Sequence, residues 1–254
     1  MNNKIGLISI IMAAYNAEKT IGAAISSVIN QTYRNWELIV VNDCSKDCTE
    51  EIVKEFMNED KRIKLISNEK NSGASQTRHN GLITSNGMWI AVLDSDDIWR
   101  EDKLEKQVIL QQKTGAEILF TGSSFIHEDG KEIQWNLHVP SEIDYKKLLK
   151  QNLISNSSVL VKKDLMSKFE AIGDYMHEDF ACWLQILRLG KIAYGIDEPL
   201  LIYRLSANSK SGNKIKAAKM NWNTYRYIGL NVFETSYYMV WYVINGLLKY
   251  RNLK

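Results

Sequence analysis

Residues 89–97 read Trp-Ile-Ala-Val-Leu-Asp-Ser-Asp-Asp, an apolar run followed at once by three carboxylates in four positions. A continuous apolar run of this length is typical of a strand buried on both faces of a parallel sheet. Such a strand delivers Asp94 to its carboxyl end, which is the edge where ligands bind in open α/β sheets. This stretch therefore predicts both an α/β sheet and a charged site at one of its edges.

The same alternation of strand and helix precedes this stretch. Short apolar runs predict strands, and apolar residues at helical spacing, such as Ile21, Ala24, Ile25 and Val28, predict helices between them. Asp47 and Glu50 have the spacing of a capping box at the start of the second helix. The predicted strands are residues 5–12, 38–41, 63–66 and 89–93, with Ala13 to Asn16 as a loop and a helix over residues 74–84.

The pattern weakens after the acidic run. We expect a helix over residues 102–112, a strand over 118–122 and a hairpin that turns at Asp129-Gly130. A later helix starts near Glu178 and buries Trp183, Leu184 and Leu187. The whole pattern predicts an α/β fold with a mostly parallel, Rossmann-like sheet flanked by helices, followed by a helical C-terminal extension.

The charge of the chain is unevenly distributed. Its 254 residues carry a net charge of +2, yet the segment from Leu201 onward has nine basic residues and only Glu234 as an acid. Residues 1–200 are therefore acidic, which argues against nucleic acid as a partner. The basic residues of this tail either bind phosphates, bind anionic lipid, or form an ordinary solvated surface.

Three cysteines, Cys44, Cys48 and Cys182, are too few and too poorly spaced for a zinc site, so we expect reduced thiols. The N-terminus lacks the pattern of a signal peptide, and we expect a cytoplasmic protein.

The acidic run suits a divalent metal. Mg²⁺ or Mn²⁺ usually bridges one or two carboxylates to substrate phosphates, and Asp94 and Asp96 are spaced to provide them. The alternative is a polar turn with a helix-capping aspartate. Phosphatases with an Asp-x-Asp motif are a third possibility, but they carry Thr or Val where Ile98 stands and place the motif on the first strand.

Four other residues have a chemical and a structural interpretation. Asp43 follows the second strand. In the functional interpretation it accepts the imide N–H of uracil while Tyr15 stacks on the base. In the structural interpretation Asp43 caps a loop and Tyr15 lies in the core. Arg78 suits a bidentate contact with phosphate, or is an exposed helix residue. Asp179, at a helix start, is a general base for an acceptor hydroxyl or a capping residue.

The ordered set of these motifs resembles glycosyltransferase family 2, the inverting transferases with the GT-A fold. The resemblance covers about residues 5–210 and is carried by residues 8–16, 26–33, 36–45, 71–73, 78–81, 93–97, 178–179 and 183–184. It implies that Ala13, Tyr15 and Asp43 hold the nucleoside, that Arg78 contacts the diphosphate, and that Asp94, Ser95 and Asp96 bind the metal and diphosphate. Asp179 would be the catalytic base of a single displacement that inverts the anomeric carbon.

The resemblance also implies partners and a division of the chain. The donor is a nucleotide-sugar, for which UDP is the expected nucleotide because of Asp43, and the acceptor is a glycan or a lipid-linked saccharide, as in enzymes that build teichuronic acid and other bacterial surface polysaccharides. Residues 1–212 would form the GT-A domain, with 1–100 as the nucleotide-binding half and 101–212 as the acceptor half, and residues 213–254 the basic and aromatic extension.

Two departures from the family pattern qualify these expectations. Ser206 stands where many relatives have a metal-binding His, within a stretch, residues 202–211, that resembles the family's lid over the diphosphate. A non-catalytic module that binds nucleotide or saccharide is therefore the alternative function. Leu189 replaces the Trp of the processive signature, so we expect hexosyl-type transfer of one sugar per encounter.

The tail from Val232 to Leu248 carries Glu234 as its only charge and is near the lower length limit for crossing a bilayer. Its polar residues Thr235, Ser236 and Asn245 favour a helix lying at the inner face of the plasma membrane, so residues 213–254 are the candidate for peripheral membrane contact. The alternative is a helix packed on the protein itself or on a partner.

Overall fold

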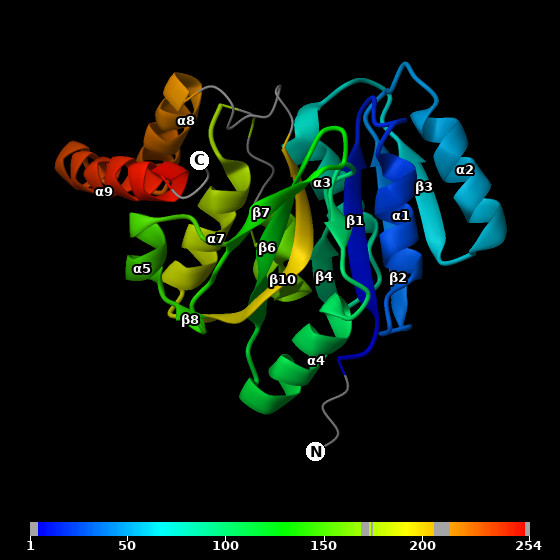
Figure 1. The fold of residues 1–254 in the computed structure, drawn as a ribbon, viewed down its shortest axis with the longest axis horizontal. Helices are drawn as coiled ribbons and strands as arrows, with labels where there is room; N and C mark the ends of the chain where they lie inside the picture. The colour runs from blue at the N-terminus through cyan, green and yellow to red at the C-terminus, as the bar shows by residue number, and fades with distance from the viewer. Residues whose placement is uncertain (1–4, 169–172, 174, 206–213, 252–254) are drawn as a thin grey trace.

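A central β-sheet with helices on both faces organises the computed structural model, which describes residues 5–168, 173, 175–205 and 214–251 (Figure 1). The strands are β1 (Ile8–Ala14), β2 (Trp36–Asn42), β3 (Ile63–Ser67), β4 (Trp89–Val92), β5 (Ile98–Trp99), β6 (Ile118–His127), β7 (Glu132–Leu137), β8 (Glu142–Ile143), β9 (Leu160–Lys162) and β10 (Ala193–Leu205). The helices are α1 (Ile21–Ile29), α2 (Thr49–Glu59), α3 (Gly73–Thr84), α4 (Lys103–Thr114), α5 (Tyr145–Lys150), the short 3-10 turn η1 (Asn156–Ser158), α6 (Lys163–Met166), α7 (Glu178–Arg188), α8 (Lys214–Tyr227) and α9 (Val232–Arg251).

The strands lie in the order β3-β2-β1-β4-β9-β6-β10-β5, with β7 beside β6 and β8 beside β10. Strands β1 to β4 pair in parallel, as the alternating sequence pattern predicts. β9 then runs antiparallel to both β4 and β6, and β10 is parallel to β6. The first half of the sheet is therefore parallel and the second half is mixed, while β1, β2, β4, β6 and β10 all end at the same edge.

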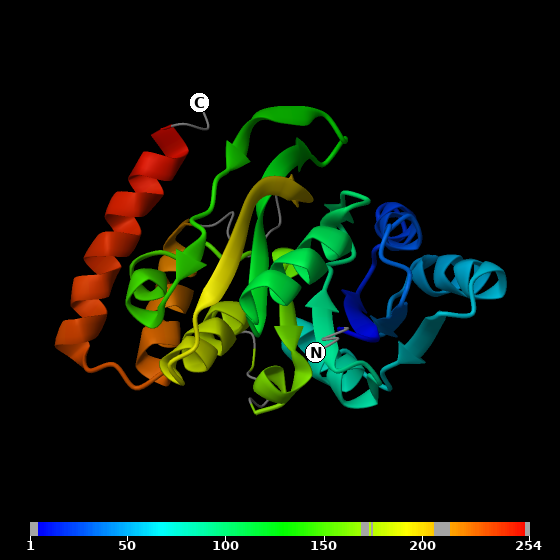
Figure 2. The ribbon, with the colours of Figure 1, turned by 90° about the horizontal axis from the view of Figure 1, so that it is seen from below.

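Two hydrophobic clusters lie on opposite faces of this sheet. Along β1, Ile10 and Met12 pack in the cluster that includes residues of α1, α2 and α4, whereas Ile11 packs in the cluster that includes residues of α3 and α7. Successive side chains of a strand point to opposite faces, so a continuous apolar run serves both layers. The resulting three layers are seen from a second direction in Figure 2.

Several local predictions are confirmed. The predicted apolar stripe of α1 is buried, and so are Trp183, Leu184 and Leu187 on α7. The hairpin between β6 and β7 turns at Gly130, which adopts a φ of 87°, and the carboxylate of Asp129 accepts the N–H of Lys131.

Other local predictions are wrong in detail. Asp47 accepts hydrogen bonds from the N–H and the hydroxyl of Thr49, but Glu50 does not turn back to complete a capping box. The Glu50 carboxylate instead accepts hydrogen bonds from Asn42 and Ser67, which ties α2 to the ends of β2 and β3. The predicted loop at residues 13–16 is shorter, because Ala13 and Ala14 continue β1 and pair with β2.

The C-terminal extension forms α8 and α9, at the end of the molecule opposite α2 and β3 (Figures 1 and 2). α8 packs on α7, where the N–H of His177 donates to the hydroxyl of Thr224 and Arg188 donates to the carbonyl of Ile228. α9 packs against α8 and α5. Within the described part of the chain, no helix is both long enough and apolar enough to cross a membrane.

Candidate active site

A cleft of about 430 Å³ opens at the carboxyl edge of the sheet. It lies among the ends of β1, β4 and β10, the helix α3 and the start of α7. The cleft brings together residues that are far apart in the sequence and that the sequence analysis selected, and Asp43 is the one selected residue that does not line it. The selected residues that line it are Ala13, Tyr15, Arg78, Asp94, Ser95, Asp96 and Asp179.

Tyr15 is positioned by two loops that are bonded to each other. The carboxamide of Asn16 accepts the N–H of Lys46, and the hydroxyl of Ser45 accepts the N–H of Asn16. Asn16 adopts a φ of 49°, a left-handed conformation that Asn tolerates better than most residues. Tyr15 is 52% exposed and lines the cleft, so the alternative interpretation as a core aromatic is wrong.

Asp43 is buried beneath the wall of the cleft. Its carboxylate accepts hydrogen bonds from Asn68 Nδ2 at 2.7 Å, from the N–H and hydroxyl of Ser72 at 2.9 and 3.1 Å, and from the N–H of Gly73 at 2.9 Å. Burial raises the pKa of Asp43, but these hydrogen bonds outweigh burial and lower it. Asp43 therefore fixes the loop that starts α3, and its contact with uracil stays a prediction.

Arg78 joins the two sides of the cleft. Its guanidinium donates to Asp94 Oδ1 at 2.6 Å and to Glu178 Oε1 at 2.8 Å, which links α3 to the end of β4 and to the start of α7. Burial lowers the pKa of Arg78, but the neighbouring carboxylates of Asp94 and Glu178 raise it by more. The Nε–H of Arg78 is buried and has no partner among the described residues, so one donor remains for a ligand.

The loop that carries the acidic run is held by the turn η1. Ser157 Oγ accepts the N–H of Asp94 at 3.1 Å and donates to Asp97 Oδ2 at 2.6 Å. Asp97 is buried, and its second oxygen accepts the N–H of Arg204 at 3.0 Å. Asp97 does not line the cleft, and it holds β10 against the loop.

Asp96 differs from Asp97 in its surroundings. It is half-buried in the cleft, and no side chain of the described residues hydrogen-bonds its carboxylate. Burial and the charge of Asp94 raise the pKa of Asp96 to about 6. A raised pKa means that the negative charge of this carboxylate is unfavourable in its surroundings, and a bound cation would stabilise that charge.

Asp179 lies on the opposite wall, in the first turn of α7. Burial and the charge of Glu178 raise its pKa above the ordinary range. No side chain within the described ranges hydrogen-bonds this carboxylate either. A raised pKa makes a carboxylate a better proton acceptor, which is compatible with a general base. The role of Asp179, general base or capping residue, stays a prediction.

The donor set fits a hard divalent ion that is shared with a ligand. Asp94 and Asp96 face one cleft, and Mg²⁺ or Mn²⁺ commonly binds one or two carboxylates together with substrate phosphates. The described residues contain no cluster of three His, Cys, Asp or Glu that could form a complete protein site. Ser206 and most of the predicted lid lie outside the described residues.

Some site residues were missed by the sequence analysis. Asn156 lines the cleft and donates to Asp94 Oδ1 at 3.3 Å, and Tyr203 reaches the cleft from β10. The polar run Asn156-Ser157-Ser158 before a buried strand was the signal for η1. Cys44, Cys48 and Cys182 are unpaired, as expected, and burial raises the pKa of Cys182 to about 12, which makes its thiol unreactive.

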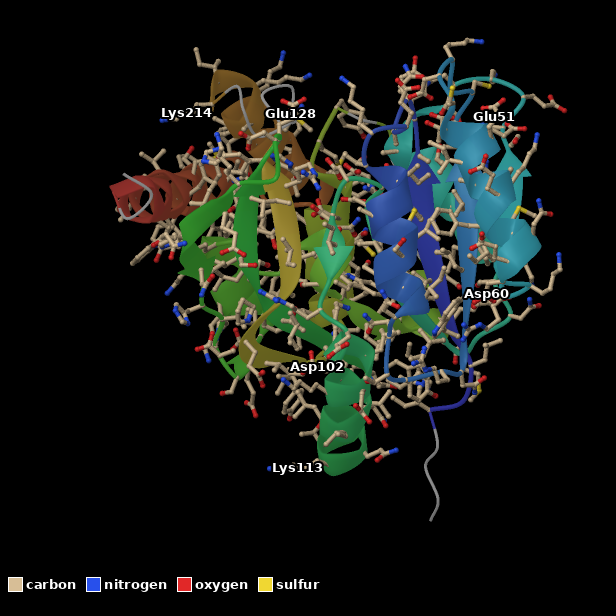
Figure 3. The ribbon with its side chains drawn as sticks, turned by 45° about the vertical axis from the view of Figure 1, so that its right-hand side comes forward. Glu51, Asp60, Asp102, Lys113, Glu128 and Lys214 are labelled. Atoms are coloured by element: carbon tan, nitrogen blue, oxygen red, sulfur yellow. The ribbon has the colours of Figure 1, made fainter. Side chains whose placement is uncertain are left out.

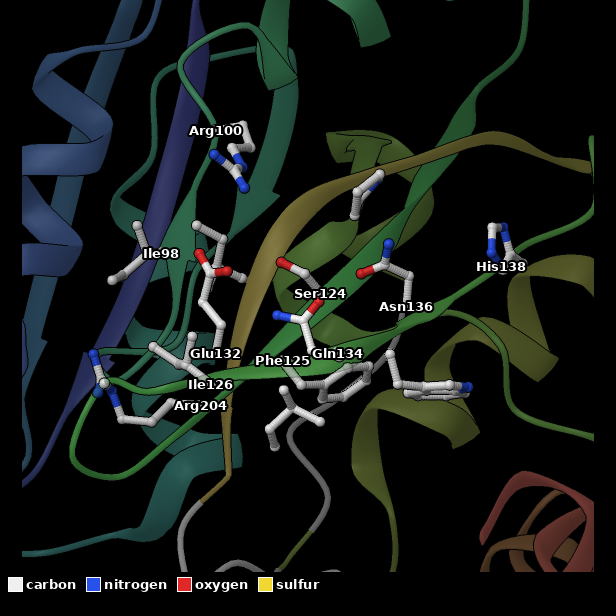
Figure 4. Close-up of a pocket in the computed structure, with 15 residues that line it drawn as sticks. Ile98, Arg100, Ser124, Phe125, Ile126, Glu132, Gln134, Asn136, His138 and Arg204 are labelled. Atoms are coloured by element: carbon white, nitrogen blue, oxygen red, sulfur yellow. The ribbon is translucent and has the colours of Figure 1, made fainter. Parts of the chain in front are cut away.

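A second cavity of about 770 Å³ lies on the β5, β6, β7 and β10 part of the sheet (Figure 4). Its wall carries Glu132, Gln134 and Asn136, and it contains none of the residues that the sequence analysis selected. Arg204 lines this cavity and donates its Nε–H to the carbonyl of Asp96 at 3.0 Å. Arg204 therefore holds the loop of the acidic run from the side of this cavity, and the cavity itself is not the candidate active site.

Charged side chains at the two edges of the sheet are compared in Figure 3. Glu128, which follows β6, and Lys214, at the start of α8, lie toward the edge of the cleft, whereas Lys113 near the end of α4 lies at the opposite edge. The C-terminal extension therefore begins on the same side of the molecule as the cleft.

The fold has close counterparts among solved structures. The chain superposes on S. aureus TarS 1-349 in complex with UDP-GlcNAc with a TM-score of 0.71, at 18% identity, over 91% of this chain and 70% of that chain. It superposes on the mannosyltransferase PcManGT of Pyrobaculum calidifontis, in complex with GDP-Man and Mn2+, with a TM-score of 0.67, at 15% identity, over 92% of this chain and 68% of that chain. The chain therefore has the GT-A fold.

The sequence comparisons narrow this class. The sequence model of the family described as glycosyl transferase family 2 matches residues 9–176. The chain is 36% identical over 250 residues to the putative teichuronic acid biosynthesis glycosyltransferase TuaG of Bacillus subtilis, which covers 98% of this chain and 99% of that protein. It is 39% identical over 246 residues to WfgD of Escherichia coli, named UDP-Glc:alpha-D-GlcNAc-diphosphoundecaprenol beta-1,3-glucosyltransferase, over 96% of this chain and 95% of that protein. The chain belongs to glycosyltransferase family 2 and is a glycosyltransferase with relatives in surface polysaccharide biosynthesis.

Proposed function

We propose that the chain transfers a hexose from a UDP-sugar to a saccharide that is linked to a lipid diphosphate, with inversion at the anomeric carbon and with a divalent metal. The observation that carries this proposal is the meeting of Asp94, Asp96 and Asp179 in one cleft at the carboxyl edge of the sheet. The name of WfgD supports the donor and the acceptor, since that relative takes UDP-Glc and a diphosphoundecaprenol-linked GlcNAc.

In the proposed step, the hydroxyl oxygen of the acceptor attacks the anomeric carbon of the donor. The new carbon–oxygen bond forms as the bond between the sugar and the diphosphate breaks, and UDP leaves with the bonding electron pair. Asp179 takes the proton of the attacking hydroxyl, and its raised pKa favours that transfer. A single displacement of this kind inverts the anomeric centre.

The remaining cleft residues bind and orient. Tyr15 lines the cleft with an exposed ring that would stack on the base, and Arg78 would contact the diphosphate. Asp94 and Asp96 would hold Mn²⁺ or Mg²⁺, which when bound stabilises charge on the departing diphosphate.

Peripheral membrane contact through residues 213–254 is part of the proposal. Phe233, Tyr237, Val240 and Ile244 are exposed on α9 and follow one another at i, i+4, i+7 and i+11. This spacing places them in one stripe, which we call the exposed stripe of α9. An exposed apolar stripe on a basic segment is typical of helices that lie at the surface of an anionic membrane.

The experiment that tests the function measures UDP release from a panel of UDP-sugars by the full chain, with Mn²⁺, Mg²⁺ or a chelator, and with GlcNAc-diphosphate lipid as acceptor. We expect release from at least one UDP-sugar that rises when the acceptor is added and that stops with the chelator. Absence of metal-dependent turnover with every donor would contradict the proposal.

The alternative, a binding module without catalysis, gives a different result. Such a module would bind UDP in the presence of metal and release no product, and Asp96→Asn would abolish that binding. If the wild-type chain transfers sugar and the Asp179→Asn variant does not, the non-catalytic binding module is excluded.

A further inference from the structure

We propose that a groove between α8 and α9 binds the diphosphate-proximal isoprene units of a polyprenyl-linked acceptor. This inference rests on the proposed function and assigns a separate part of the molecule to the lipid. The groove has a volume of about 390 Å³ and is bounded by α8, α9, the start of α7 and the segment after α5. We call it the α8–α9 groove.

The walls of the groove are mostly apolar. Phe180, Tyr225 and Val243 come from three different helices, and the alanines of α8 leave the space between them open. Tyr225 contributes only its apolar ring to the groove, because its hydroxyl is buried and donates to the carbonyl of Leu149 at 2.7 Å. Apolar walls of this kind stabilise hydrocarbon by removing it from water.

The groove lies next to the active-site cleft. His177 lines both cavities, and it stands two residues before Asp179. Lys214 lines the groove close to this junction. An acceptor whose hydroxyl reaches Asp179 therefore places its next group, the diphosphate, beside His177 and Lys214, and its hydrocarbon chain between α8 and α9.

The far end of the groove approaches the exposed stripe of α9. Val243 lines the groove, and it lies three residues, about one helical turn, after Val240 of the stripe on the same helix. A chain anchored in a membrane thus has an apolar path from the stripe, through the groove, to the cleft. A groove of this size takes only the start of a polyprenyl chain, so the rest stays in the membrane.

Two variants alter the groove in different ways. Val243→Glu places a charge on its wall at a residue that is 51% exposed, so folding is not expected to suffer. Gly246→Leu fills it, since a Cβ at Gly246 meets nothing within 4 Å and leucine favours a helix over glycine. The matched control is Val232→Glu, the same substitution on the same helix at a residue that is 53% exposed and lies outside the groove.

Binding is measured by calorimetry with farnesyl diphosphate, a soluble polyprenyl diphosphate, at saturating UDP and Mn²⁺ so that the cleft is filled. We expect the wild-type chain and Val232→Glu to bind it alike, and Val243→Glu and Gly246→Leu to bind it at least about tenfold more weakly, because only a few buried methylene groups need to be lost. Inorganic diphosphate should bind weakly to all four proteins.

The outcomes separate this inference from the proposed function. Equal binding of farnesyl diphosphate by all variants, or no binding by the wild type, overturns the groove assignment even if the chain transfers sugar. Binding that obeys the pattern above supports the groove even if the donor panel fails. With an active donor, the groove variants should raise the KM for a polyprenyl acceptor about tenfold and leave the KM for the UDP-sugar unchanged; unchanged KM values for both would also overturn the assignment.

Discussion

Glu37 at one edge of the sheet and the pair Asp96 and Asp179 at the other differ in the hydrogen-bond donors around their carboxylates. At the amino edge of the parallel strands, Glu37 accepts hydrogen bonds from Ser9 at 2.6 Å, from Lys64 at 2.7 Å and from the N–H and side chain of Asn86 at 2.7 and 3.0 Å. At the carboxyl edge, Asp96 and Asp179 are half-buried and receive no hydrogen bond from any side chain of the part of the chain described by the structure. The protein thus supplies the donors for Glu37 itself and provides no side-chain donor for Asp96 and Asp179 within the described residues.

The pKa values follow the same division. Burial raises the pKa of Glu37, but its hydrogen bonds from Lys64, Ser9 and Asn86 reverse that effect and lower the pKa to about 2. Burial raises the pKa of Asp96 and of Asp179, and nothing comparable reverses it. The direction of the pKa shift of these three carboxylates is therefore decided by their hydrogen-bond donors, not by burial alone.

The largest expected effect is that of Asp179→Asn on catalysis. Loss of the general base should lower kcat about 1,000-fold, with little change in the KM for the donor. The midpoint of thermal unfolding should stay the same or rise, because the variant removes a charge that burial disfavours. Product release and thermal unfolding are the two measurements, and a variant that keeps a tenth of the activity would contradict the assignment.

Arg78→Gln should damage both properties, because Arg78 bridges Asp94 and Glu178 across the cleft. Two charge-assisted hydrogen bonds are lost, so we expect a loss of about 2–3 kcal/mol in the free energy of unfolding. We also expect a raised KM for the donor. Lys54→Gln, which breaks an exposed pair with Glu50, is the control and should change neither quantity measurably.

Gly81→Ala tests the distance between α3 and the sheet. An added Cβ would lie 2.7 Å from Ile11 Cγ2 and 3.2 Å from Val41 Cγ2, so α3 must move away from β1 and β2. We expect a destabilisation of about 2 kcal/mol in chemical unfolding. Gly22→Ala on α1, whose added Cβ would meet its neighbours at 3.8 and 4.0 Å, should instead be neutral or slightly stabilising. Destabilisation by both variants would show that close packing at Gly81 is not the cause.

Glu37→Gln should have the smallest effect and should affect stability alone. We expect a loss of about 1 kcal/mol at neutral pH, because several hydrogen bonds lose a charged acceptor. The pKa of Glu37 is lowered by folding, so its contribution is complete above pH 4.5 and is lost as the pH falls towards about 2. Unfolding of both proteins across this pH range should show the difference shrinking with acid, whereas a constant difference would exclude ionisation as its source.

The sequence predicted the carboxyl edge better than the amino edge. Asp94, Asp96 and Tyr15 follow apolar strands directly, and the topology of parallel strands brings such residues together. Glu37 lies inside a strand beside Trp36 and Leu38, where no pattern distinguishes a bonded carboxylate from an exposed one. Its donors come from three other segments, so only the folded chain reveals its role.

The second half of the chain was predicted least well, again for a physical reason. Strands β9 and β10 pair with partners that are distant in the sequence. No turn motif next to either strand predicts these pairings. Asn156 and Tyr203 reach the cleft only because of those pairings. The predicted division at residue 100, and the boundary at residue 212, remain predictions.

The long reach of β10 has a consequence for how the enzyme is made. β1 to β4 are complete once residue 92 has left the ribosome, and domains generally fold as the chain emerges. The loop that holds Asp96 is different, because its backbone is fixed by Arg204, which is synthesised more than a hundred residues later. A nascent chain can therefore form the parallel part of its sheet early, but it acquires the contacts that fix the acidic loop only after residue 204 has been synthesised.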